Sequence, residues 1–170
     1  MSIIKNFIIL ILVGLFAVNA NSQEVKKVGK FKDWETMVIT EQAGKVCFAQ
    51  SVPVLQAPKS NLREARMFVS FRPGEKVSNE ISITGGYEFN NKNSITAISG
   101  KSKYKFDLIQ DGFAWMSDVE NKLEKKMIKT MKKGSRIMIT GYNQKGSQTK
   151  EHYSLLGFTK AYNATKANCS

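Results

Sequence analysis

The sequence contains a single histidine, His152, and only two cysteines, Cys47 and Cys169. A metal site with two or more imidazole ligands is therefore excluded, and a zinc site built on thiolates would need both cysteines. The sequence has no C-x-x-C redox pair, no G-x-S-x-G nucleophile elbow and no phosphate-binding G-x-x-x-x-G-K-[ST] loop. These absences predict no catalytic residues, no metal and no cofactor, and thus a protein that is not an enzyme.

Two weak arrangements keep an enzymatic alternative open. In Glu151-His152-Tyr153-Ser154 a base and a hydroxyl stand two residues apart, but no orienting carboxylate or oxyanion turn accompanies them, so an exposed strand histidine is favoured. Paired carboxylates are the other arrangement, since a hydrolase needs only two that converge. The candidates for such a pair are Asp33, Glu35, Glu80, Glu88 and Asp107.

The first twenty residues have the pattern of a secretory signal peptide. Lys5 lies in a short polar start, residues 7–18 form an apolar run with one glycine, and Val18-Asn19-Ala20 offers a cleavage site. The apolar run is too short for a transmembrane anchor, which takes about 20 residues. We therefore expect residues 1–20 to be removed on export to the periplasm or cell surface of a Gram-negative bacterium, and residues 21–170 to form one domain.

Arginine is scarce among the basic residues, which give the chain a net charge of +12, or +11 without Lys5. The arginines are Arg63, Arg66, Arg72 and Arg136. Because arginine gives bidentate recognition of phosphate and guanine, a lysine-dominated chain indicates solubility and weak attraction to anions. Export also argues against nucleic acid as the partner, and we expect any membrane contact to be peripheral.

Export predicts a disulfide bond, because an even number of cysteines is normally paired in an oxidising compartment. The available intramolecular pair is Cys47 with Cys169. Two free thiols or an intermolecular bridge are the alternatives.

Alternation of apolar and polar residues with a period of two dominates residues 21–170. Turn-forming residues separate nine predicted strands, a spacing that favours an antiparallel β-sandwich or barrel. The predicted strands cover residues 31–40, 46–52, 66–71, 77–84, 94–99, 104–109, 113–116, 135–142 and 152–158. Residues 53–61 hold two of the three prolines and no periodicity, so they predict a long surface loop suited to binding.

One amphipathic helix interrupts the strands. Ser117 to Glu120 is typical of a capping box, an apolar stripe of Val119, Leu123, Met127 and Met131 follows with Ile128 beside it, and Gly134 ends the helix. Its lysines are a possible patch for an anionic surface, although a solvated outer face that also opposes the helix dipole is the favoured explanation. These are Lys122, Lys125, Lys126, Lys129, Lys132 and Lys133. A second, shorter helix is predicted over residues 159–168.

Several short motifs, in this order, resemble the invasion-associated locus B family of bacterial envelope proteins. They are Phe31-Lys32-Asp33-Trp34, Val46-Cys47-Phe48-Ala49, Gly86-Tyr87-Glu88-Phe89, Ala114-Trp115 and Tyr153-Ser154-Leu155-Leu156-Gly157-Phe158, with the terminal Cys169. The resemblance implies an immunoglobulin-like antiparallel β-sandwich, export, and a role named for host-cell invasion, without catalytic residues to carry over. Many members have a second early cysteine near the position of Val38, and its absence here favours the Cys47–Cys169 pair.

Large aromatic side chains in these motifs are expected to fill the sandwich core. They are Trp34, Tyr87, Trp115 and Phe158. The sequence thus predicts an exported, disulfide-stapled β-sandwich that binds another envelope protein or an anionic surface polymer. A periplasmic assembly factor with chaperone-like use of sheet edges is an alternative, and a carboxylate-based hydrolase is another. Oligomeric state is left open.

Overall fold

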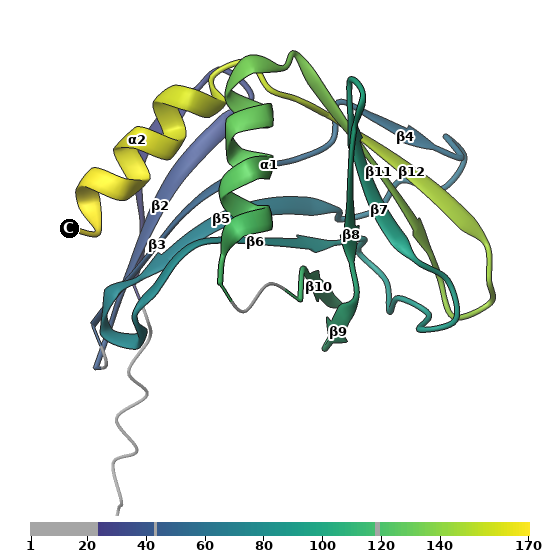
Figure 1. Ribbon diagram of the computed structural model, residues 1–170, viewed down its shortest axis with the longest axis horizontal. Coiled ribbons are helices and arrows are strands. Elements are labelled where there is room, and N and C mark those ends of the chain that lie inside the picture. Colours follow the sequence, from purple (N-terminus) through teal and green to yellow (C-terminus); the bar gives the residue numbers. More distant parts are fainter. Residues whose placement is uncertain (1–23, 43, 118–119) are drawn as a thin grey trace, which may run out of the picture.

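The computed structural model describes residues 24–42, 44–117 and 120–170, which form two antiparallel β-sheets and two helices (Figure 1). The mainly β, two-sheet architecture with two helices that the sequence predicts is confirmed. The expected signal peptide, residues 1–20, lies outside the described residues and stays a prediction. Among the helices that are described, none has the length and apolar character needed to cross a membrane.

The larger sheet has seven strands, and the smaller sheet has five. The order in the larger sheet is β1 (Val25–Phe31), β2 (Trp34–Glu41), β3 (Gly44–Ser51), β5 (Arg66–Arg72), β6 (Val77–Thr84), β10 (Phe113–Trp115) and β9 (Leu108–Gln110). The order in the smaller sheet is β4 (Leu55–Ala57), β12 (Gln148–Ser154), β11 (Arg136–Tyr142), β7 (Ile95–Ser99) and β8 (Ser102–Phe106). A 3₁₀ turn, η1 (Pro73–Glu75), joins β5 to β6.

The core lies between the inner faces of the two sheets and under the helices α1 (Lys122–Lys133) and α2 (Phe158–Asn168). Along β2 the alternation is direct: Trp34 and Thr36 are buried, while Glu35 and Met37 are partly exposed. The Trp34 indole N–H donates a hydrogen bond to the Ser154 carbonyl at 2.9 Å, which joins the larger sheet to the end of β12. The alternating pattern therefore assigns each strand one core face and one outer face.

The helix α2 covers the inner face of β1, β2, β3 and β5 (Figure 1). The Phe158 ring packs edge-on against Trp34 with ring centroids 4.8 Å apart, and the Thr36 hydroxyl donates to the Ala161 carbonyl. At the other end of the helix, Cys169 is bonded to Cys47 of β3. The predicted disulfide is therefore confirmed, and it fixes the C-terminal end of α2 to the sheet.

Helix α1 begins later than the capping-box motif predicts. It starts at Lys122, after Asn121 in a left-handed conformation, and the Ser117 amide instead donates to the Asp107 carboxylate. Met127, Ile128 and Met131 are buried and Gly134 follows the helix as predicted, but Leu123 is 47 % exposed. The predicted stripe is thus correct in its second half, where the helix contacts both sheets and α2, and wrong at Leu123. Asp118 and Val119 lie outside the described residues.

Three boundaries between strands and loops also differ from the prediction. The predicted strand over residues 31–40 is the end of β1 and most of β2, separated by a turn at Lys32 and Asp33. The predicted strand over residues 152–158 ends at Ser154, and Phe158 already belongs to α2. The predicted loop over residues 53–61 contains β4, because its backbone pairs with β12.

The four aromatic residues expected in the core occupy three kinds of position. Trp34 and Phe158 are fully buried, and Tyr87 is half-buried at the margin of the core. The prediction for Trp115 is corrected: it is half-buried on the outer face of β10, because Ala114, its neighbour in the alternation, takes the inward position.

Gly157 is the residue at which the chain turns from β12 into α2. Its φ is +90°, and a Cβ atom there would lie 1.7 Å from the Phe31 carbonyl oxygen, a backbone atom that cannot rotate away. We expect Gly157→Ala to lower the free energy of unfolding by about 2 to 4 kcal/mol, because backbone strain adds to the collision. Urea unfolding followed by circular dichroism measures this.

Gly100 supplies the matched control for this substitution. Its φ is +56°, but a Cβ there meets nothing within 4 Å. Gly100→Ala is therefore expected to cost about 1 kcal/mol, the strain of the left-handed conformation alone. Equal losses in the two variants would show that the close approach to Phe31 is unimportant.

Candidate functional site

The residues that the sequence offers for catalysis are held apart or already paired. No group of three or more His, Cys, Asp and Glu side chains that could hold a metal occurs in the described part of the chain. Within β12, His152 and Ser154 face away from Glu151, which is buried against Arg63. Burial, followed by the charges of Arg136 and Lys150, lowers the pKa of His152. The half-triad suggested by residues 151–154 is therefore not assembled.

The candidate carboxylates for a hydrolase mostly have partners of their own. Arg72 binds both oxygens of Glu80 at 2.8 and 3.0 Å, and Asp107 accepts the Ser117 amide at 3.0 Å. Asp33 and Glu35 line one cleft, where a hydrogen bond from Lys27 chiefly lowers the pKa of Glu35. A carboxyl with a lowered pKa is ionised at neutral pH, which suits binding better than proton donation.

The proline-containing loop that the sequence marks as a binding loop is clamped to the smaller sheet. Gln56 exchanges two hydrogen bonds of 2.9 Å with the backbone of Arg63, and the Arg63 guanidinium binds Glu151 at 2.9 Å. The side chains of Arg63 and Glu151 are only 4 % and 3 % exposed. The loop is thus built into the fold, because its polar groups are satisfied inside it.

The Arg63–Glu151 pair belongs to a longer buried chain of hydrogen bonds. The second Glu151 oxygen accepts from Thr149 at 3.2 Å, and Thr149 bonds the Tyr87 hydroxyl at 2.6 Å. Burial is the main cause that raises the pKa of Tyr87 to about 12, and burial also raises the pKa of Glu151 against the influence of Arg63. These shifts mark a structural network, since the groups are largely withdrawn from solvent and bonded to one another.

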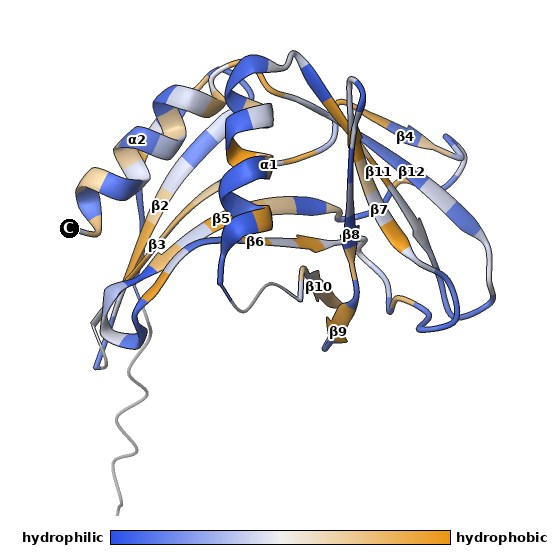
Figure 2. Ribbon diagram, in the orientation of Figure 1, coloured by the Kyte–Doolittle hydropathy of each residue, from blue (hydrophilic) through white to orange (hydrophobic). Residues whose placement is uncertain are grey.

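All six lysines that the sequence marks on α1 are exposed, and we call them the lysine face. They are Lys122, Lys125, Lys126, Lys129, Lys132 and Lys133. At 3.6 residues per turn they lie within an arc of roughly 120°, opposite the buried Met127 and Met131. Figure 2 shows the mixed character of α1, with hydrophilic segments interrupted by apolar ones. The Lys132 ammonium lies 3.9 Å from the centroid of the Tyr162 ring, which holds that end of the face against α2.

Strand β8, which contacts α1, also carries exposed lysines. The Tyr104 hydroxyl of β8 forms a 2.6 Å hydrogen bond with the Thr130 hydroxyl of α1. The helix and this edge of the sheet therefore lie side by side. Because Tyr104 and Phe106 point into the core, Lys103 and Lys105 point outward from the same strand. Exposed lysines therefore occur on the edge strand of the smaller sheet as well as on the helix.

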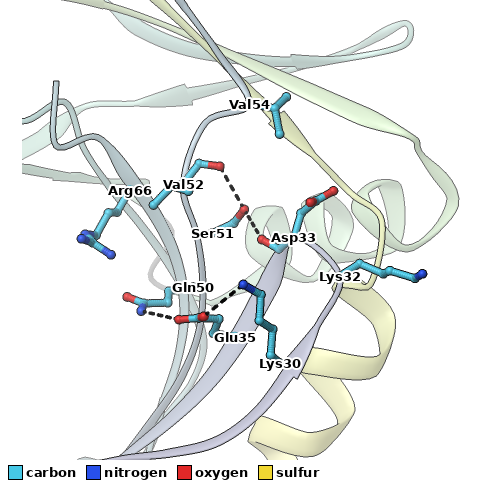
Figure 3. A pocket seen from close by; sticks show the side chains of 9 residues that line it. All are labelled: Lys30, Lys32, Asp33, Glu35, Gln50, Ser51, Val52, Val54 and Arg66. Atoms are coloured by element: carbon cyan, nitrogen blue, oxygen red, sulfur yellow. Dashed lines mark hydrogen bonds and ion pairs between the residues drawn. The ribbon is translucent and has the colours of Figure 1, made fainter. Parts of the chain in front are cut away.

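A cleft of about 220 Å³ opens at the β1–β2 end of the larger sheet (Figure 3). Its centre is Glu35, which binds Lys30 and accepts a 3.5 Å hydrogen bond from Gln50. Arg66 and Lys32 lie on opposite sides of it in Figure 3. The remaining lining residues are Asp33, Ser51, Val52 and Val54. Cations, carboxylates, an amide and apolar side chains thus meet in one hollow.

Beside this cleft, four aromatic rings cross the outer face of the larger sheet, and we call them the aromatic row. They are Phe48, Phe68, Phe113 and Trp115, all half-buried. Successive centroids are 5.8, 6.0 and 5.7 Å apart. Trp115 continues the row to the 53 % exposed Leu108, its partner across β10 and β9. Both side chains also line a second hollow of about 630 Å³.

Sequence reasoning missed the aromatic row, although part of its signal was present. Phe48 and Phe68 alternate with buried neighbours in their strands, which marks them as outward-facing. Their proximity depends on strand order and register, because Gln50 is opposite Phe68, and Ser82 is opposite both Phe68 and Trp115. Neither order nor register can be read from alternation alone.

The fold and these surfaces define a class of protein: a two-sheet antiparallel β-sandwich whose C-terminal helix is tied to the larger sheet by a disulfide. The chain belongs to the invasion associated locus B (IalB) protein family, whose sequence model matches residues 34–166. The resemblance of its motifs is thereby confirmed. IalB family proteins are not known as enzymes.

A solved structure supports the fold independently. The crystal structure of invasion associated protein B from Bartonella henselae matches with a TM-score of 0.56 and 13 % sequence identity. The match covers 82 % of this chain and 96 % of the Bartonella chain. At this identity the likeness shows the fold alone. No curated protein matches the chain at a significant level.

Proposed function

We propose that this protein is a non-enzymatic component of the bacterial envelope, in the periplasm or at the cell surface, that binds an anionic surface polymer. The observation that carries the proposal is the lysine face of α1, where six exposed lysines share one side of a 12-residue helix. Within the helix the charge is one-sided, because Glu124 is buried on the opposite side. Just before the helix, the exposed Glu120 pairs with Lys122, so in the described part of the chain the unpaired positive charge lies mainly on the later lysines. Such a field attracts polyanions and is screened by salt.

A polymer fits the lysine face better than a folded envelope protein does. Protein interfaces have an apolar, often aromatic centre that is depleted of lysine, and a polar rim. The lysine face has lysines along its whole length, and the neighbouring strand β8 carries two more exposed lysines, Lys103 and Lys105. A flexible chain of negative charges can follow such a strip without burying apolar area.

We expect the protein comprising residues 21–170 to bind fluorescent dextran sulfate and purified lipopolysaccharide, and not neutral dextran. Replacing Lys122, Lys125, Lys126 and Lys129 together by glutamine should weaken binding roughly tenfold or more at low salt, since local positive charge is what concentrates a polyanion. Fluorescence anisotropy at increasing salt measures both the affinity and its screening. Glutamine preserves helix propensity, so α1 is retained.

The control variant removes the same charge elsewhere. Lys26, Lys45, Lys59 and Lys92 are exposed on other elements, and replacing these four by glutamine gives an identical net charge. This control is expected to lose far less affinity. If both variants weaken binding equally, overall charge and not the lysine face is responsible, and if neither polyanion binds, the proposed function is wrong.

A further inference from the structure

The outer face of the larger sheet carries a surface that the lysine face does not explain. Helices α1 and α2 and the smaller sheet lie on the other side of this sheet in the described part of the chain (Figure 1). The aromatic row crosses β3, β5, β6 and β10, a distance of about 14 Å at a strand spacing of about 4.8 Å. Such a continuous strip of half-exposed rings exceeds the scattered apolar residues of an ordinary surface.

The spaces between the rings are filled by small hydroxyl residues. Ser70 is opposite Phe48, and Ser82 lies between Phe68 and Trp115 in register. Both serines are at least nine-tenths buried, so the rings lean over them. The result is a shallow apolar track along which the four rings are partly exposed.

The track runs into the cleft of Figure 3 through Gln50, which is opposite Phe68 on one side and Glu35 on the other. The cleft offers donors from Lys30, Arg66 and the Gln50 amide, and acceptors from Glu35 and Asp33. Lys32 is a third cation in the lining, so three positive and two negative side chains give the cleft little net charge. Mixed donors and acceptors match hydroxyl groups, which both donate and accept, better than they match a strong anion.

We propose that the aromatic row and the adjoining cleft form a binding site for an oligosaccharide chain. The apolar C–H faces of pyranose rings stack on Phe68, Phe113 and Trp115, and the hydroxyl groups of the next sugar bond Gln50, Glu35 and Arg66 in the cleft. A saccharide gains from both parts of the site, whereas an apolar partner would take water from the cleft's charged groups without offering them hydrogen bonds in return. This site is separate from the lysine face and would operate if that face bound nothing.

Tryptophan fluorescence reports on this site directly. The chain has two tryptophans, of which Trp34 is completely buried and Trp115 lies in the aromatic row. We expect residues 21–170 to bind at least one glycan on a printed array of bacterial and mammalian glycans. The corresponding free oligosaccharide should then shift the emission of Trp115 and protect it from acrylamide quenching, while Trp34 contributes a constant background.

Substitutions distinguish stacking from general hydrophobicity. Phe113→Ala and Phe113→Leu are both expected to weaken the binding roughly tenfold or more, because leucine keeps the apolar contact but lacks a ring face. Tyr142→Ala removes a half-exposed aromatic from β11 of the other sheet and should leave the affinity unchanged. Thermal unfolding of each variant verifies that it is folded.

Four outcomes would overturn the proposal. These are no glycan bound on the array, binding that Phe113→Leu preserves, binding that only the lysine-face variant abolishes, and protection of Trp115 that depends on protein concentration without any glycan. The third outcome would assign the glycan to the lysine face, and the fourth would make the aromatic row a contact between copies of the chain. Loss of polyanion binding in the lysine-face variant with Trp115 protection intact would separate the two sites.

Discussion

Replacing Cys47 and Cys169 together by alanine is expected to lower the free energy of unfolding by about 4 to 5 kcal/mol, because the bond closes a loop of 122 residues. Without the bond, the unfolded chain regains the freedom that this closure removes. Urea denaturation monitored by circular dichroism measures the difference. The loss is a large fraction of the 5 to 15 kcal/mol that stabilises an ordinary domain.

The double substitution also removes two buried side chains, so the cross-link has to be separated from packing. Wild-type protein reduced with dithiothreitol keeps both sulfur atoms and loses only the bond. We expect the reduced protein to show most of the loss. Unfolding at the same urea concentration before and after reduction would contradict the expected result.

Replacing Arg63 by methionine is expected to cost about 3 to 5 kcal/mol, since it leaves Glu151 buried without its ionic partner. The same substitution frees the loop that Arg63 ties down through the carbonyls of Ala57, Pro58 and Asn61. Thermal and urea unfolding measure the stability. Hydrogen exchange should show faster opening of β4 and of its pairing with β12.

The pH dependence of this variant follows from the pKa of Glu151. Burial raises that pKa, and Arg63 lowers it, so removing Arg63 raises it further. A carboxyl whose pKa is higher in the folded than in the unfolded state binds protons preferentially when folded, so stability rises as the pH falls. Arg63→Met should therefore recover part of its loss between neutral pH and the pKa of an ordinary glutamate.

A double variant tests whether the loss comes from the unpaired charge. Arg63→Met with Glu151→Leu removes both charges and should be more stable than Arg63→Met alone, because no carboxylate is left buried. Arg66→Met is a control that removes an arginine bound only to the highly exposed Glu64, and it is expected to cost less than 1 kcal/mol. Equal losses of stability in Arg63→Met and Arg66→Met would show that the buried ion pair contributes no more than the exposed one.

The sequence predicts most of the fold because alternation assigns inward and outward positions strand by strand. It misses β1 as a separate strand, since the residues of β1 are mostly exposed and alternation is weak at a sheet edge. It places Leu123 on the apolar stripe of α1, although the residue that is buried in the first turn of the helix is Glu124, which accepts the Ile81 amide of β6. The apolar periodicity of a helix cannot show which of its turns will be covered by neighbouring strands.

The candidate surfaces differ in how far they can be predicted. The lysine face belongs to one helix, so a period of 3.6 residues is enough to find it. The aromatic row comes from β3, β5 and β10, which meet only through their order and register in the sheet. For the same reason the role of Arg63 stays hidden, because its partner Glu151 is 88 residues away.

The disulfide joins β3 to the residue that follows α2, so this bond requires α2 to lie against the larger sheet. As long as α2 is not docked, the inner surface of β2, β3 and β5 around Trp34 and Phe71 lacks the cover that Phe158 and Tyr162 give it in the folded protein. During this interval the sheet presents an apolar surface that a holdase chaperone would recognise. Once α2 has docked, an external thiol oxidant takes two protons and two electrons from the Cys47 and Cys169 thiols, and the resulting bond holds α2 over that surface as a latch on completed folding.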